Sequence, residues 1–385
     1  CMDSPLQSGN ENHLPTLGSE HPAHSTTHHT PSSLVQRVKG LVSNHTFLLV
    51  LLVFILGFIV RAQLMRYELF FEFDSYWHAR MVSYLLQGIP FTGVDPLAYY
   101  QNIHAATIPS APLLFWYISA AIYKIFTLNG AYVFENWVLW VKILPALYGA
   151  FTCVAMFFLG KSLFKGKGEN AVGFFAGILA AVVPSFVYRT MGGFFEDDSL
   201  GFLWMVVGLV FFVRATRDPM WKRENIVNAV LAGVSFALMA ITWSAFNQLV
   251  PVLLGIGFLQ FVLWISENHF EKAKHYAQLW GISFIIFAIA ATFESGTFWL
   301  EQFGGFLGPL FLRNAEIIKA PEVAVFLLLF FGFTALLYHL KSRQKIPDSV
   351  FKKAVAVVVL FFVFVPLIAP IVDLSFNSGD VLGRT

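Results

Sequence analysis

From residue 46 onward, long apolar runs alternate with short polar segments. The runs have 15 to 24 residues. About 20 helical residues cross the hydrocarbon core of a bilayer, and flanking residues can lengthen the shorter runs. The pattern therefore predicts an all-α polytopic membrane protein. The nine predicted spans are 46–62, 137–160, 171–188, 199–213, 226–243, 247–265, 278–293, 322–340 and 354–373.

The same pattern divides the chain into three parts. Residues 1–45 are rich in Ser, Thr, Pro and His and have no hydrophobic period, which predicts a disordered tail. Residues 46–373 form the predicted transmembrane domain, in which 63–136 is a long first external loop. Residues 374–385 are expected to begin a further external loop.

Charge predicts the orientation of the spans. The polar loops 161–170, 214–225, 266–277 and 341–353 carry 14 of the 25 Lys and Arg residues, and basic loops mark the cytoplasmic side. With nine spans, these loops and the N-terminal tail all lie in the cytoplasm. If a tenth apolar stretch, 111–127, also crossed, the tail would have to lie outside. We therefore prefer to place this stretch within the first external loop.

Composition narrows the class of protein. The chain is 57% hydrophobic and 12% charged, about half the charged share of soluble domains. Its formal net charge of +2 is too small to predict nucleic-acid binding. The only two cysteines, Cys1 and Cys153, exclude a disulfide framework and a cysteine-ligated zinc or iron–sulfur site. The high hydrophobic share and the low charged share predict the lipid bilayer as a partner.

Two short stretches on the predicted outer side carry the candidate chemistry. One begins at Phe73 and reads FDSYWHAR, and the other begins at Tyr188 and reads YRTMGGFFEDD. The second ends in three consecutive acids beside an apolar span, which repel one another unless a counter-charge is near. Such oxygen ligands suit Mg²⁺ or Mn²⁺. Charge alone leaves a solvated acidic loop as the alternative.

The second stretch closely resembles the second acidic motif of the oligosaccharyltransferase catalytic subunit, Arg-Thr-x-x-Gly-aromatic-aromatic-Asp-x-Asp, as in the single-subunit archaeal and bacterial enzymes. The first stretch resembles the first acidic motif of that family. Residues 242–246, TWSAF, are similar to a Thr-Trp-Gly-Gly-aromatic stretch at the end of the family's fifth span. The resemblance extends over residues 46–385.

This resemblance implies a C-type glycosyltransferase (GT-C) transmembrane fold. It also implies metal-dependent transfer of a glycan from a polyprenyl-linked (pyro)phosphate donor to the Asn of Asn-x-Ser/Thr in an acceptor polypeptide. Carried over, Asp74, Glu196 and Asp198 would be the catalytic residues and the ligands of Mg²⁺ or Mn²⁺. Arg189 and Arg80 are candidates for support or phosphate contact. The site would face outside the cell membrane, or the protein would lie in the endoplasmic reticulum membrane of a eukaryote.

The sequence departs from the family pattern in several places. Glu196 stands where the family usually has Asp, so Asp197 is an alternative ligand. The later Glu motif of the fifth external loop and the Trp-Trp-Asp-Tyr-Gly motif are missing. Glu294 matches the former poorly and is interpreted as an interfacial loop acid. We expect a truncated enzyme that is inactive by itself, the other interpretation being an inactive remnant.

Two other functions compete. A protein O-mannosyltransferase-like GT-C enzyme would share an early acid in the first external loop, but should lack the stretch that begins at Tyr188. A secondary transporter would carry ionisable residues within its spans and show inverted repeats, whereas these acids lie at span ends.

For His78 and Arg80, packing within the first loop is favoured over a role in chemistry.

Overall fold

A computed structural model describes residues 45–89, 94–95, 106–107, 113–243, 245–246 and 249–295, and residues 336–354 except 337, 345, 348 and 352. The predicted N-terminal tail, the segment 374–385 and most of the last two predicted spans lie outside the described residues.

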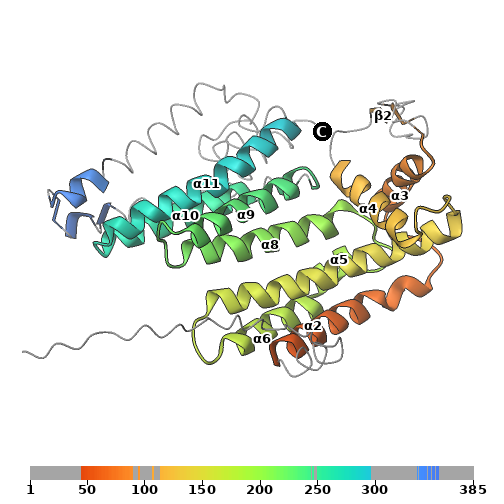
Figure 1. The fold of residues 1–385 in the computed structure, drawn as a ribbon, viewed down its shortest axis with the longest axis horizontal. Coiled ribbons are helices and arrows are strands. Elements are labelled where there is room, and N and C mark those ends of the chain that lie inside the picture. The colour runs from red at the N-terminus through yellow and green to blue at the C-terminus, as the bar shows by residue number, and fades with distance from the viewer. Residues whose placement is uncertain are drawn as a thin grey trace, which may run out of the picture. The chain divides into compact units, whose positions relative to one another are not determined.

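The described chain is almost entirely helical (Figure 1). Its helices are α2 (His45–Ala62), the 3-10 helix η1 (Gln63–Arg66), α3 (Phe73–Leu86), α4 (Leu113–Phe126), α5 (Phe134–Leu163), α6 (Glu169–Val182), α7 (Pro184–Thr190), α8 (Asp197–Thr216), α9 (Arg223–Ala240), α10 (Leu249–Ser266) and α11 (Phe270–Ser295). Two short antiparallel strands, β1 (Val94–Asp95) and β2 (Ala106–Thr107), pair within the predicted first loop.

Seven of the nine predicted spans coincide with helices, namely α2, α5, the pair α6–α7, α8, α9, α10 and α11. Within the described residues, three helices are long and apolar enough to cross a membrane, namely α2 continued by η1, α5 and α8. A fourth results if α6 and α7, which are bent by 66°, count as one span. The count of nine spans stays a prediction. Glu294 was expected in a loop, but α11 extends to Ser295 and Glu294 lies in its last turn.

Helices α5 and α8 lie side by side near the centre of the bundle (Figure 1). Helix α5 also packs against α6, where Gly160 and Gly173 allow the two backbones to approach closely. A Cβ atom on Gly173 would lie 2.6 Å from the Phe157 carbonyl oxygen. Small residues commonly permit such contacts between membrane helices, where dispersion replaces the hydrophobic effect as the driving force. Helix α8 packs against α9, and α9 against α11.

The predicted first loop contains its own packed helices. Helix α4 has 14 residues, a length of about 21 Å that is shorter than a hydrocarbon core. It buries Phe115, Trp116 and Tyr123 in a cluster shared with α3 and α5. Trp116 Nε1 donates to Nδ1 of the buried His78 at 2.8 Å. Burial lowers the pKa of His78 to about 3, so this neutral ring serves packing, as expected.

Candidate active site

The three consecutive acids follow a tight turn between α7 and α8. Gly193 in this turn has φ +94°, a conformation that favours glycine. The Gly192 N–H donates to the Arg61 carbonyl at 2.9 Å, and a Cβ on Gly192 would lie 2.5 Å from Met65 Cγ. The glycine pair thus lets the chain turn closely against the end of the first span.

The acids themselves occupy the start of α8. Glu196 is the residue before the first helical turn, and Asp197 and Asp198 lie in that turn. The Ser199 hydroxyl donates to the Glu196 carbonyl at 2.9 Å. Carboxylates at this end of a helix interact favourably with the positive end of its dipole. The local sequence therefore both starts the helix and gathers negative charge there.

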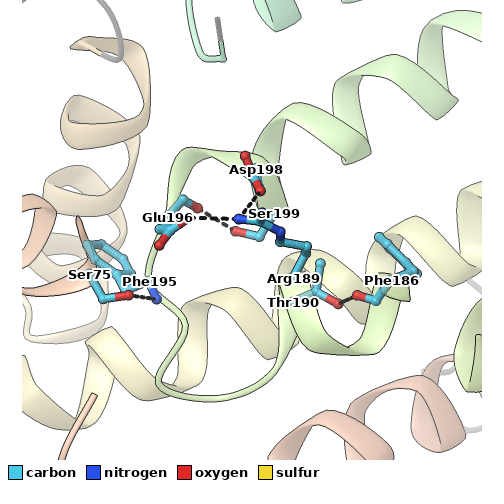
Figure 2. A network of polar contacts seen from close by, with 8 residues as sticks. All are labelled: Ser75, Phe186, Arg189, Thr190, Phe195, Glu196, Asp198 and Ser199. Carbon is cyan, nitrogen blue, oxygen red and sulfur yellow. Dashed lines mark hydrogen bonds and ion pairs between the residues drawn. The ribbon is translucent and has the colours of Figure 1, made fainter. Parts of the chain in front are cut away.

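The structure brings the two acidic stretches together (Figure 2). The buried Ser75 hydroxyl accepts the backbone N–H of Phe195 at 2.9 Å, and the Phe71 N–H donates to the Gly193 carbonyl at 3.2 Å. Ser75 follows Asp74 in the first turn of α3. Asp74, whose side chain is exposed, thus lies at the same end of the bundle as the acids of α8, despite their separation in sequence.

Arg189 supplies the counter-charge of the cluster. Its Nη1 lies 3.4 Å from Glu196 Oε2 and 3.2 Å from Asp198 Oδ2 (Figure 2). It pairs with residues 196 and 198, and no ion pair with Asp197 is found among the described residues. The Arg189 guanidinium also lies 5.4 Å from the centre of the Phe194 ring, which restricts its position.

Glu196 is an acid of the cluster whose pKa departs strongly from its ordinary value. Its side chain is buried, with 6% exposure. This burial raises the pKa of the Glu196 carboxyl to about 8, and the like charges of Asp198 and Asp74 add to the effect, while Arg189 opposes it. Asp74 and Asp198 thus both lie close enough to act on the Glu196 carboxyl.

The donor set fits a hard divalent cation only in part. Glu196 Oε1 is buried and has no hydrogen-bond partner, as expected of an oxygen reserved for a ligand. Carboxylate oxygens are what Mg²⁺ and Mn²⁺ accept. Yet no three His, Cys, Asp or Glu side chains in the described residues are arranged to hold a metal ion. The acids are neighbours, with Arg189 between two of them.

The other two predicted site residues are both partly buried. Asp197 is partly buried at the first position of α8. Arg80 is partly buried in α3, six residues after Asp74, which at 100° per residue turns it to another side of that helix. Trp243, from the TWSAF stretch, lies beside the Asp198 carboxylate and packs against Gly201 of α8.

Arg61 is a buried residue near the site that sequence reasoning missed. Its Nε donates to Thr190 Oγ1 at 2.6 Å, and its Nη atoms donate to the carbonyls of Gly57, Ala180 and Ala181 at 3.0 to 3.3 Å. It connects α2 to both sides of the break between α6 and α7. The available signal was an arginine within a span, because buried charge in a membrane protein requires partners.

Relatives of this chain are archaeal glycotransferases. Dolichyl-phosphooligosaccharide-protein glycotransferase 2 of Pyrococcus horikoshii is 23% identical over 303 residues, which cover 76% of this chain and 36% of that protein. Glycotransferase 3 of Archaeoglobus fulgidus is 23% identical over 201 residues, which cover 49% and 22%. The chain spans about a third or less of the length of these curated relatives.

Solved structures show the same fold. The Archaeoglobus fulgidus oligosaccharyltransferase tethered with an acceptor peptide containing the NVT sequon has a TM-score of 0.55 and 17% identity, and the match covers 84% of this chain and 38% of that one. The archaeal oligosaccharyltransferase AglB of the same organism, in complex with an inhibitory peptide and a dolichol-phosphate, has a TM-score of 0.50 and 15% identity, with 81% and 38% covered.

The expected all-α GT-C transmembrane fold is therefore confirmed. A family described as Oligosaccharyl transferase STT3, N-terminal, matches residues 65–378, which is most of the chain. The expected resemblance to the oligosaccharyltransferase catalytic subunit is thereby also confirmed. The chain belongs to the oligosaccharyl transferase STT3 family, of which it represents the N-terminal membrane portion.

Proposed function

We propose that this chain is the membrane part of an enzyme that transfers a glycan from a polyprenyl-linked (pyro)phosphate donor to the Asn of Asn-x-Ser/Thr in an acceptor polypeptide. Family membership supports the reaction class. A dolichol-phosphate complex and a peptide with an NVT sequon, both of archaeal neighbours, support the two substrates. The observation that carries the proposal is the meeting of the two acidic stretches through Ser75 and Phe195.

In this proposal Asp74, Glu196 and Asp198 hold Mg²⁺ or Mn²⁺, and Asp197 is the alternative ligand. The unpartnered Glu196 Oε1 supports its assignment as a ligand. A divalent cation held there would supply Lewis acidity towards the (pyro)phosphate leaving group. Asp74, exposed at the start of α3, would also accept a hydrogen bond from the acceptor carboxamide and so orient this weak nucleophile.

Arg189 has two roles in the proposed cycle. Without substrate it neutralises Glu196 and Asp198. With the donor bound, the same guanidinium is placed to contact phosphate, because a planar fork of N–H groups suits phosphate oxygens. For Arg80, partial burial within α3 supports a packing role over phosphate contact.

The proposed orientation places the acidic cluster outside the cell membrane, or in the lumen if the membrane is that of the endoplasmic reticulum. A single cysteine at the exposed Glu68, near the cluster, should then react with an impermeant maleimide added from that side. A cysteine at Lys167, in the loop between α5 and α6, should not. The native Cys1 is replaced by Ser in both variants, and the native Cys153 is buried and gives little background. If the cysteine at position 167 were labelled from the same side as the cysteine at position 68, the proposed orientation would be overturned.

Substitutions in the full-length enzyme test the roles of the acids. Asp74→Ala or Asp198→Ala should lower glycan transfer to an Asn-x-Thr peptide by about a thousandfold or more, since each removes a charged group at the reacting centre. Glu196→Asp should retain activity, and Asp197→Asn should be mild. The matched control is Glu267→Ala, which removes an exposed acid elsewhere. If Asp197→Asn is more damaging than Glu196→Asp, the ligand assignment is off by one residue.

Binding of Mn²⁺, followed by electron paramagnetic resonance, separates a metal role from a purely structural one. Asp198→Ala should weaken Mn²⁺ binding while the Glu267→Ala variant retains it. Equal Mn²⁺ affinity in wild type and Asp198→Ala would refute the ligand role even if transfer is lost. We expect the 385-residue chain alone to transfer no glycan, and measurable transfer by it would refute the interpretation as a part of a longer enzyme.

A further inference from the structure

A second charged site lies at the other end of the same helices. Helix α8 begins at the acidic cluster and ends 20 residues later at Thr216, about 30 Å away. There the loop between α5 and α6 meets the loop between α8 and α9, and the ion pair Lys165–Asp218 joins them. Residues of these two loops and of the adjacent helix ends line a cavity of about 820 Å³.

This cavity, which we call the basic pocket, is lined by more cations than acids. Its acidic residues are Glu169, Asp218 and Glu224. Its basic residues are Lys161, Lys165, Arg214, Arg217 and Arg223. The lining therefore has a formal charge of +2, and the excess cations surround a space large enough for a small anion.

Contacts within the basic pocket leave the arginines available. Lys161 pairs with Glu169 at 3.2 Å, and Lys165 pairs with Asp218, so the two lysines are neutralised. By contrast, the described residues provide no carboxylate within ion-pair distance of any of the three arginines. Asp218 lies close enough for the charge of Arg217 to act on it, but arginines without an ion-paired carboxylate can still accept an anionic ligand as partner.

Two of these arginines are held in place by one residue. Arg214 Nε donates to the hydroxyl of the buried Ser162 at 3.2 Å, and Arg217 Nη1 donates to its backbone carbonyl. Each guanidinium has five N–H donors, so each retains donors for a ligand. Fixed guanidinium groups of this kind recognise phosphate with two parallel hydrogen bonds.

Apolar side chains beside the basic pocket indicate where the anion comes from. Four apolar residues on these loops and at the end of α5 expose between 43% and 63% of their surface, namely Leu163, Phe164, Met220 and Trp221. They flank the ends of α5 and α8, which are long and apolar enough to span a membrane. An exposed tryptophan beside basic residues at a span end is typical of the membrane interface, where lipid headgroups are concentrated.

We propose that the basic pocket binds a phosphate-bearing anion, and that this anion is the headgroup of an anionic phospholipid. The headgroup phosphate accepts hydrogen bonds from Arg214, Arg217 and Arg223, while the acyl chains lie against the exposed apolar side chains. Basic pockets between membrane helices are suited to such headgroups. The site is independent of the acidic cluster and of the glycan transfer proposed above.

Native mass spectrometry of the chain in neutral micelles tests the proposal. Phosphatidylglycerol is titrated against phosphatidylcholine as competitor, and a separate arm contains inorganic phosphate at matched ionic strength. Arg217→Gln with Arg223→Gln removes two pocket cations. The control, Lys167→Gln with Lys222→Gln, removes two exposed cations from the same loops that do not line the pocket. Arg223→Gln alone keeps the contact to Ser162 intact and guards against misfolding.

The wild-type chain should retain phosphatidylglycerol in preference to phosphatidylcholine. The pocket pair should lose about tenfold in affinity for it, Arg223→Gln should lose a smaller part, and the control pair should bind as wild type does. An equal loss in the control pair would show diffuse surface charge and overturn the pocket. Equal retention of the two lipids, with inorganic phosphate bound in a pocket-dependent way, would overturn the lipid source.

Discussion

Replacing Arg61 by Met should loosen the helix break that positions the acidic cluster. Met keeps much of the side-chain volume but removes every donor. Pro184 lies four residues after Ala180 and has no N–H, so the Ala180 carbonyl at the end of α6 lacks its helical partner. Arg61 Nη2 supplies one at 3.2 Å, Nη1 reaches the Ala181 carbonyl at 3.3 Å, and Nε holds Thr190 at 2.6 Å.

The expected cost follows from these contacts. Leaving a buried carbonyl without a partner costs about 1–3 kcal/mol, and the three carbonyls and the Thr190 hydroxyl that accept from Arg61 each lose a donor. Removing a buried charge recovers part of its desolvation penalty, so we expect a net loss of about 2–4 kcal/mol. For a domain of this size, that corresponds to a fall in the melting temperature of about 3–6 °C.

Thermal unfolding in detergent, followed by tryptophan fluorescence, measures this change. The control is Arg66→Met, because Arg66 is exposed and its only described contacts are with Tyr67. Its melting temperature should stay within about 2 °C of wild type. A variant Arg61→Met that melts together with Arg66→Met would show that Arg61 does not hold the break.

Three further predictions use the same melting assay. Gly149→Ala should destabilise the protein strongly, because the added Cβ would lie 2.3 Å from Arg61 Nε. Gly281→Ala places its Cβ in open space and should be neutral or stabilising. The reverse order would contradict the packing of α5 on α2. Ser75→Ala should cost about 1–2 kcal/mol by leaving the buried Phe195 N–H without an acceptor, and an unchanged melting temperature would argue against the link between the acidic stretches. The pKa of His78 is about 3 in the folded protein and near 6.5 in an unfolded chain, so the free energy of unfolding should fall as the pH drops below about 6.5. His78→Gln should weaken this pH dependence between pH 7 and 5. An identical dependence in the variant would refute the contribution of His78.

The apolar pattern predicts helices well because lipid requires continuous hydrophobicity along a span. Helices α2, α5 and α8 coincide with predicted spans within a few residues. The pattern predicts one span over 171–188, whereas the structure breaks there into α6 and α7. Apolar composition does not change at the break, so hydrophobicity could not reveal it. Pro184 was a local signal, since proline disrupts a helix at the residues that precede it.

The sequence predicts candidate residues for the site but not the contacts among them. The family resemblance names Glu196 and Asp198 as ligands, and in the structure Arg189 contacts both carboxylates. No sequence pattern links Ser75 to Phe195 or Arg61 to Thr190, because these pairs are more than a hundred residues apart. Such contacts depend on how the spans pack, which single residues do not encode.

The acidic cluster owes its geometry to the break between α6 and α7. Because α6 ends before Pro184, the chain bends by 66° and α7 carries Arg189 towards the start of α8. Gly193 then reverses the chain, so that Glu196 arrives with one oxygen near the guanidinium and the other buried without a partner. The cluster is therefore assembled around an internal cation. Any ligand that needs these two carboxylates must therefore displace Arg189 from them, because the guanidinium already lies between Glu196 and Asp198.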